Sequence, residues 1–105
     1  MGCARMDLEF HFVAELWNYR TNAATWFFVS LPKEAAQDIR FFREGRRVGF
    51  GTVRVTVTIG DVQWKTSLFP DKETGSFILP IKADVRKKAA LAVGDQVHVF
   101  LRVGV

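Results

Sequence analysis

The fold is decided by residues 48–88, VGFGTVRVTVTIGDVQWKTSLFPDKETGSFILPIKADVRKK. Within this stretch two β-rich runs flank Gly60-Asp61, a two-residue connection of the kind that tight hairpins prefer. With these residues as the loop, one apolar face carries the pairs Ile59–Val62, Val57–Trp64, Val55–Thr66 and Val53–Leu68. The other face pairs Thr58 with Gln63, Thr56 with Lys65, and Arg54 with Ser67. A shift by one residue would exchange the two faces, so the pattern predicts one register.

Downstream of the hairpin, the sequence predicts a loop and a further strand. Phe69-Pro70 is expected to end the second hairpin strand, and residues 71–75 are rich in turn formers. Apolar residues then alternate over 77–81, which predicts a strand. Pro80 within it indicates a sheet edge or a bulge, because proline has no N–H to donate.

The end of the chain predicts a short helix over 83–91, a turn at Gly94-Asp95 and a last strand over 97–103. Strands outnumber helices, and both helices lie between strands. We therefore expect a mainly β fold, a small β-barrel of about six strands with two short helices, because closure hides the sheet edges.

Upstream of the hairpin, period-two alternation predicts a half-buried strand over residues 8–17. Residues 18–22 are polar and predict a turn, and a second strand is expected from Ala24 through TWFFVSL. Pro32 is suited to the first turn of a helix, with an apolar stripe of Ala35, Ile39 and Phe42, and Gly45 is suited to its end.

Length and composition predict one domain over residues 7–105, with residues 1–6 a disordered or vector-derived start. A hydrophobic fraction of 49% excludes a disordered chain. The net charge of +4 is too small to predict nucleic-acid binding, which we do not expect.

The cysteine content bears on the compartment and on metal binding. Cys3 is the single cysteine, so we expect no internal disulfide, no cysteine-based metal site and a cytoplasmic location. No apolar run reaches the ~20 residues that a membrane span needs, so no membrane association is expected. We also expect no cofactor.

Residues with catalytic chemistry are few and form no known motif. His11 and His98 are the only histidines, and neither lies in a metal-binding motif such as HExxH. Ser67 is not in a GxSxG elbow, and its predicted neighbour Arg54 cannot act as a base. We therefore expect no enzyme, with a hydrolase as the remote alternative.

The best functional candidate is a cationic and polar cluster. Arg54, Lys65 and Ser67 share the polar face of the predicted hairpin, while Lys82 and Arg86 are four residues apart at the start of a predicted helix. If the fold brings these two groups together, a small anionic ligand or a partner could bind between them. The alternative is that they cover a solvated face and that Lys82 pairs with Asp84 or Glu73.

Two other functions stay open. One is a dimeric nucleic-acid-binding barrel that uses the basic cluster from Arg40 to Arg54, namely Arg40, Arg43, Arg46, Arg47 and Arg54. The other is a protein-interaction module, monomer or homodimer, that uses the mixed face of the first strand, where Trp17 is expected beside Val13.

Several blocks in fixed order resemble the family of domain of unknown function 1905. They are FVAEL (12–16), WFFVSLP (26–32), GFGTVRVTVTIG (49–60), WKTSLFPDK (64–72), LPIKADVRKKAAL (79–91) and VGDQVHV (93–99). The resemblance covers nearly the whole chain after Met6. It implies a small β-barrel without an established activity, and its most distinctive blocks contain Lys65, Lys82 and Arg86.

Overall fold

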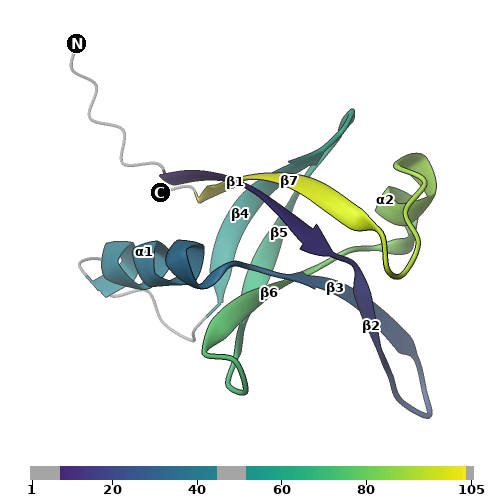
Figure 1. Cartoon of the computed structure of the whole chain (residues 1–105), viewed down its shortest axis with the longest axis horizontal. Coiled ribbons are helices and arrows are strands. Elements are labelled where there is room, and N and C mark those ends of the chain that lie inside the picture. The colour runs from purple at the N-terminus through teal and green to yellow at the C-terminus, as the bar shows by residue number, and fades with distance from the viewer. Residues whose placement is uncertain (1–7, 45–51, 104–105) are drawn as a thin grey trace.

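The computed structural model describes residues 8–44 and 52–103, except the side chains of residues 42–44. Seven strands in this part form one curled antiparallel sheet, a half-barrel, in the order β1-β7-β4-β5-β6-β3-β2 (Figure 1). The strands are β1 (Leu8–Glu15), β2 (Trp17–Arg20), β3 (Thr25–Ser30), β4 (Val53–Ile59), β5 (Val62–Asp71), β6 (Ser76–Pro80) and β7 (Gln96–Val103); the helices are α1 (Lys33–Glu44) and α2 (Ala83–Lys88). The predicted mainly β fold with two short helices is confirmed.

Leu16 joins the two edges of the sheet. It alone separates β1 from β2, yet these strands lie at opposite ends of the strand order. Leu16 is fully buried, its N–H donates to the Asp95 carbonyl at 3.0 Å, and its carbonyl accepts from the Gly94 N–H at 2.9 Å. The chain therefore bends at Leu16 from one edge of the curled sheet to the other.

This bend corrects two sequence predictions. The single strand expected over 8–17 is divided in two, which explains why the sheet has one strand more than about six. The turn expected over 18–22 lies later, because β2 continues to Arg20. The Thr21 hydroxyl then accepts from the N–H groups of Ala23 and Ala24, at 3.1 and 3.0 Å, and so stabilises the observed turn.

The β4–β5 hairpin has the register that the sequence predicts, from Ile59 opposite Val62 to Val53 opposite Leu68. Its four β4 residues on the inner face are buried: Val53, Val55, Val57 and Ile59. Gly60 at the turn has φ +59°, in the left-handed region that tight hairpin turns require. Local alternation and turn chemistry were therefore sufficient to predict this element.

β5 and β6 form a fork. The expected end of β5 at Phe69-Pro70 is wrong, because β5 leaves β4 after Leu68 and pairs with β6 from Phe69–Ile78 to Asp71–Ser76. Beyond that short pairing the two strands diverge, and β6 pairs only with β3 (Figure 1).

Pro80 lies on the open side of this fork. The next residue, Ile81, donates its N–H to the Phe27 carbonyl beside β3 at 2.8 Å. Successive N–H groups of a strand point to opposite sides, so the Pro80 nitrogen faces the side from which β5 has diverged. β6 is an interior strand in the order, but at Pro80 it has no partner on the β5 side, so the expected edge is observed at this residue only.

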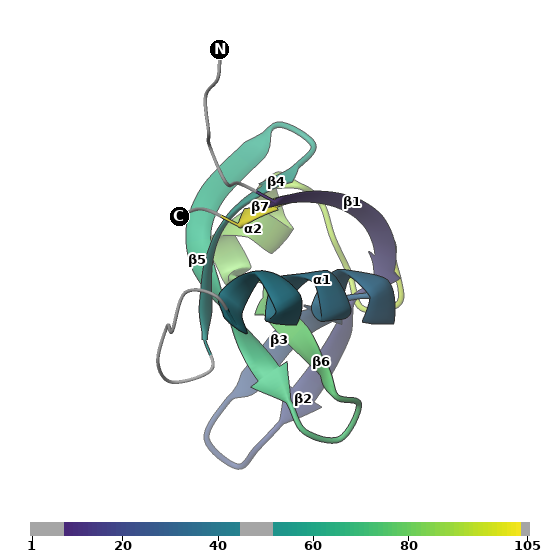
Figure 2. The ribbon, with the colours of Figure 1, turned by 90° about the vertical axis from the view of Figure 1, so that its left-hand side faces the viewer.

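The helices lie at opposite ends of the half-barrel (Figure 1), and α1 crosses one of these ends (Figure 2). In α1 the predicted stripe is buried at Ala35 and Ile39, whereas the Phe42 side chain lies outside the described residues. α2 ends at Lys88 instead of Leu91, because Ala90 takes φ +55° and leaves the helical conformation. No helix in the described ranges is long and apolar enough to span a membrane.

Candidate binding site

The five residues of the predicted cluster fall into two separate groups. Arg54 and Ser67 are paired across β4 and β5, and Lys65 lies two residues before Ser67, so all three side chains share the outer face of the hairpin. Lys82 and Arg86 lie instead on α2, Lys82 at its N-cap and Arg86 within the helix. The structure therefore does not bring the two groups together.

A hollow of about 460 Å³ opens where β5 and β6 diverge. Its walls come from β3, β5, the end of β6 and the start of α2, namely Thr25, Trp26, Phe27, Thr66, Phe69, Pro80, Ile81, Lys82, Ala83 and Arg86. Thr66 lines it, whereas its neighbours Lys65 and Ser67 on the opposite face of β5 do not. The alternation that fixes the hairpin register is thus also what separates Lys65 and Ser67 from Lys82.

Arg86 is held in place by two contacts. Its Nη1 donates to the Ile81 carbonyl at 2.8 Å, and its Cζ lies 3.5 Å from the centre of the Phe27 ring. The guanidinium therefore stacks on an aromatic face, and because the side chain is half-buried, part of its hydration is removed there. A guanidinium has five N–H donors, and this geometry leaves others for a ligand.

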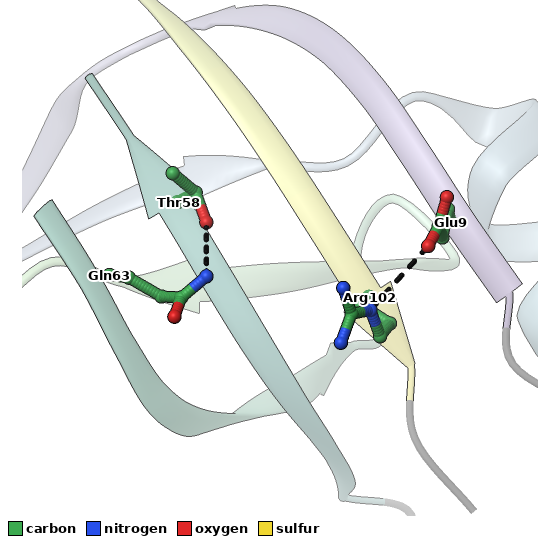
Figure 3. A network of polar contacts seen from close by, with 4 residues as sticks. All are labelled: Glu9, Thr58, Gln63 and Arg102. Atoms are coloured by element: carbon green, nitrogen blue, oxygen red, sulfur yellow. Dashed lines mark hydrogen bonds and ion pairs between the residues drawn. The ribbon is translucent and has the colours of Figure 1, made fainter. Parts of the chain in front are cut away.

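Lys82 supplies a second cation, one helical turn before Arg86. It occupies the N-cap position of α2 without a side-chain cap, and its side chain is exposed. Within residues 8–44 and 52–103 no carboxylate lies within 4.0 Å of either cation, and the alternative pairing of Lys82 with Asp84 or Glu73 is not observed. The ion pair found there joins Arg102 to Glu9 at 3.5 Å, on the outer face of β7 and β1 (Figure 3).

The outer face around β4 also carries polar contacts. Gln63 donates to the Thr58 hydroxyl at 3.0 Å across the hairpin (Figure 3). His11 and His98 are both exposed on the neighbouring strands, with ring centres 6.3 Å apart. In the described part of the chain, no group of three His, Cys, Asp or Glu side chains could hold a metal ion.

An aromatic groove adjoins the hollow, and the sequence analysis missed it. The groove has a volume of about 330 Å³ and is lined by Tyr19, Trp26, Phe28, Phe69, Ile78 and Pro80. Strand pairing explains it, because Tyr19 lies opposite Trp26, Phe28 opposite Pro80, and Phe69 opposite Ile78. The available signal was TWFFVS, a strand that is apolar on both faces in a chain too small to cover both.

Trp17 belongs to this aromatic side of the molecule. Its Nε1 donates to the Ser30 hydroxyl at 3.0 Å, and its ring packs 5.1 Å from Phe28. The expected patch of Trp17 beside Val13 is not formed along one strand, because the bend at Leu16 places Val13 on β1 and Trp17 on β2, at opposite ends of the strand order. Val13 is exposed on the mixed face of β1 that the interaction-module hypothesis uses, and Phe100 is exposed on the neighbouring β7, opposite His11.

The basic cluster of the nucleic-acid hypothesis is described only in part. Arg54 is exposed on the hairpin, and Arg40 is exposed on α1 with its Cζ 5.9 Å from the centre of the Phe77 ring. The side chain of Arg43 and the residues Arg46 and Arg47 lie outside the described residues, as does the start over residues 1–6.

The comparison with family models gives one match, which covers the strands and the helix that line the hollow and the groove. The model described as "Domain of unknown function (DUF1905)" matches residues 12–101. The search of the curated proteins found no match.

Proposed function

We propose that this chain, which belongs to the family of domain of unknown function 1905, binds a small organic acid without catalysing a reaction. The acid would occupy the hollow at the fork between β5 and β6. Its acidic group would contact Lys82 and Arg86, and its apolar body would pack against the walls around Phe27 and Trp26.

The observation that carries the proposal is the pairing of an apolar hollow with two cations that have no carboxylate partner in the described part of the chain. A volume of about 460 Å³ lies within the range of small-molecule sites, which combine apolar walls with a few polar groups. Arg86 is already oriented by Phe27 and the Ile81 carbonyl, so binding would cost little side-chain entropy. A charge-assisted hydrogen bond contributes about 1.5–3 kcal/mol.

The chemistry of the walls supports binding without catalysis. Apart from the two cations, the polar side-chain groups lining the hollow are the hydroxyls of Thr25 and Thr66 and the indole N–H of Trp26. Among residues that the structure describes, no histidine, cysteine or carboxylate lines it, so neither hydroxyl has an adjacent general base there. We infer that the domain holds its ligand unchanged, and a cytoplasmic location is part of the same proposal.

Thermal shift with a panel of benzoate, phenylacetate, acetate and inorganic phosphate would test the proposal. An aryl carboxylate at ten times its Kd should stabilise the fold by about 1.4 kcal/mol. For a domain of this size that corresponds to a rise in Tm on the order of 5–10 °C. Phosphate, which has no apolar body, should give the smallest shift.

Two matched variants locate the site. Lys82→Met removes one cation from the hollow and should abolish most of the shift with the aryl carboxylate. Lys65→Met makes the same change of charge on the opposite face of β5 and should leave the shift intact. Equal losses in both variants would show that only net charge matters, and no shift with any carboxylate would refute the proposed function.

A further inference from the structure

We infer that the natural ligand is an organic acid with an extended apolar tail, whose head lies at Lys82 and Arg86 and whose tail lies along the aromatic groove. This inference rests on the proposed function and adds the ligand class. Its basis is that the hollow and the groove adjoin, since Trp26, Phe69 and Pro80 line both.

The groove is an exposed apolar surface on the outer face of the sheet. Tyr19, Trp26 and Phe69 are 58%, 53% and 43% exposed, although each is a large side chain on a regular strand. Together with Phe28, Ile78 and Pro80 they form one contiguous patch and not scattered single residues. Contiguous apolar patches of this kind mark binding sites in folded domains.

The floor of the groove is formed by residues with fixed positions. Phe28 packs against Trp17, which is itself held by its hydrogen bond to Ser30. Pro80 cannot pair with a neighbouring strand on the fork side, so its ring stays available between the hollow and the groove. A tail that enters from the hollow would therefore meet a preformed apolar path past Pro80 towards Ile78 and Tyr19.

The distribution of charge selects the occupant. The two cations lie at the α2 end, and none of the six groove residues is charged. Arg20 is on β2 beside Tyr19, but strand alternation places its side chain on the opposite face. A single-stranded nucleic acid requires cations that follow its phosphates along the whole path. One cationic end and an uncharged length match one acidic head and one apolar tail.

The test uses the straight-chain carboxylates from butyrate to decanoate, with Kd measured by calorimetry. Each added CH₂ that enters the groove should tighten binding by about two- to fourfold, since complete burial of one CH₂ corresponds to about fourfold. Lys82→Met should weaken binding of every member of the series, because all share the carboxylate head.

Ile78→Ser changes a residue that lines the groove but not the hollow. It should weaken decanoate binding about tenfold and leave butyrate binding unchanged, and the retained butyrate affinity shows that the variant is folded. Phe100→Ser removes an exposed aromatic residue from the outer face of β7 and should leave the whole series unchanged.

The outcomes separate the two proposals. Butyrate binding that depends on Lys82, with no gain along the series, would overturn the tail assignment and leave the proposed function in place. Chain-length dependence without any effect of Lys82→Met would overturn the placement of the head. Tight, salt-sensitive binding of a ten-nucleotide oligothymidylate, lost in Trp26→Ala, would replace the acid by a nucleic acid. If no carboxylate binds, both proposals fail together.

Discussion

The two halves of the curled sheet have similar inner faces and different outer faces. The hairpin half consists of β1, β7, β4 and residues 62–68 of β5, and the aromatic half consists of the remainder of β5 with β6, β3 and β2. Both contribute fully buried residues to one core, such as Leu101 from the first half and Leu79 from the second. The outer face of the hairpin half is mainly polar, whereas that of the aromatic half exposes Tyr19, Trp26 and Phe69.

This difference distinguishes the apolar residues that the core requires from the apolar residues that it does not require. Antiparallel sheets with one covered face normally alternate apolar and polar residues, as β4 does. β3 carries aromatic side chains on both faces, and the curl of the sheet covers only the inner one. The outer aromatic residues are therefore not needed to close the core, and the comparison directs attention to them as the functional surface.

The largest expected effect tests whether the inner faces are equivalent. Leu101→Ala and Leu79→Ala each leave a cavity at a fully buried site, so each should lower the free energy of unfolding by about 2–5 kcal/mol. Urea denaturation measures both. A loss below about 1 kcal/mol in only one of them would show that the two halves do not share a core.

The next effect concerns the turns that set the two halves. Gly94 has φ +96° beside the bend at Leu16, and Gly60 has φ +59° at the tip of the hairpin. Neither position would bring an added Cβ into contact, so substitution changes only backbone strain. Gly94→Ala should cost about 1–3 kcal/mol, and Gly60→Ala about 1 kcal/mol, because +59° lies within the left-handed basin of L-residues. Thermal unfolding that ranks them in the opposite order would contradict the larger strain expected at φ +96°.

The sequence predicted the β4–β5 hairpin well because its information is local. A two-residue turn and strict alternation determine every pair from Val53–Leu68 to Ile59–Val62. The aromatic half depends on pairings between distant segments, such as β3 with β6, and on the bend at Leu16. Nothing in the sequence near Leu16 marks that bend, because its two hydrogen bonds go to residues 94 and 95.

The candidate site was predicted in part for the same reason. Lys82 and Arg86 are close in sequence, so their proximity could be predicted from helical spacing. Whether Lys65 and Ser67 joined them depended on which face of β5 turns towards α2. That orientation follows from the divergence of β5 and β6, which a long-range pairing decides.

A smaller effect distinguishes two tryptophans, one from each half. Trp17 Nε1 donates to Ser30, whereas Trp64 Nε1 is buried with no hydrogen-bond partner among the described residues. Trp17→Phe loses a hydrogen bond, and Trp64→Phe removes an unsatisfied donor at similar cost in apolar contact. Chemical denaturation should show Trp17→Phe to be less stable than Trp64→Phe by about 1 kcal/mol. Equal stabilities would indicate that the Trp64 N–H has a partner.

The smallest expected effect compares the outer faces directly. Glu9→Gln removes the ion pair with Arg102, whose two side chains are about half exposed, so the free energy of unfolding should change by less than about 1 kcal/mol. Tyr19→Ser alters an exposed side chain that lines only the groove and should change stability by a similarly small amount. Decanoate binding should nevertheless weaken in Tyr19→Ser and remain unchanged in Glu9→Gln. Two variants that are alike in stability and unlike in binding would assign the function to the aromatic half, whereas equal decanoate affinities would remove the main reason for treating the two outer faces differently.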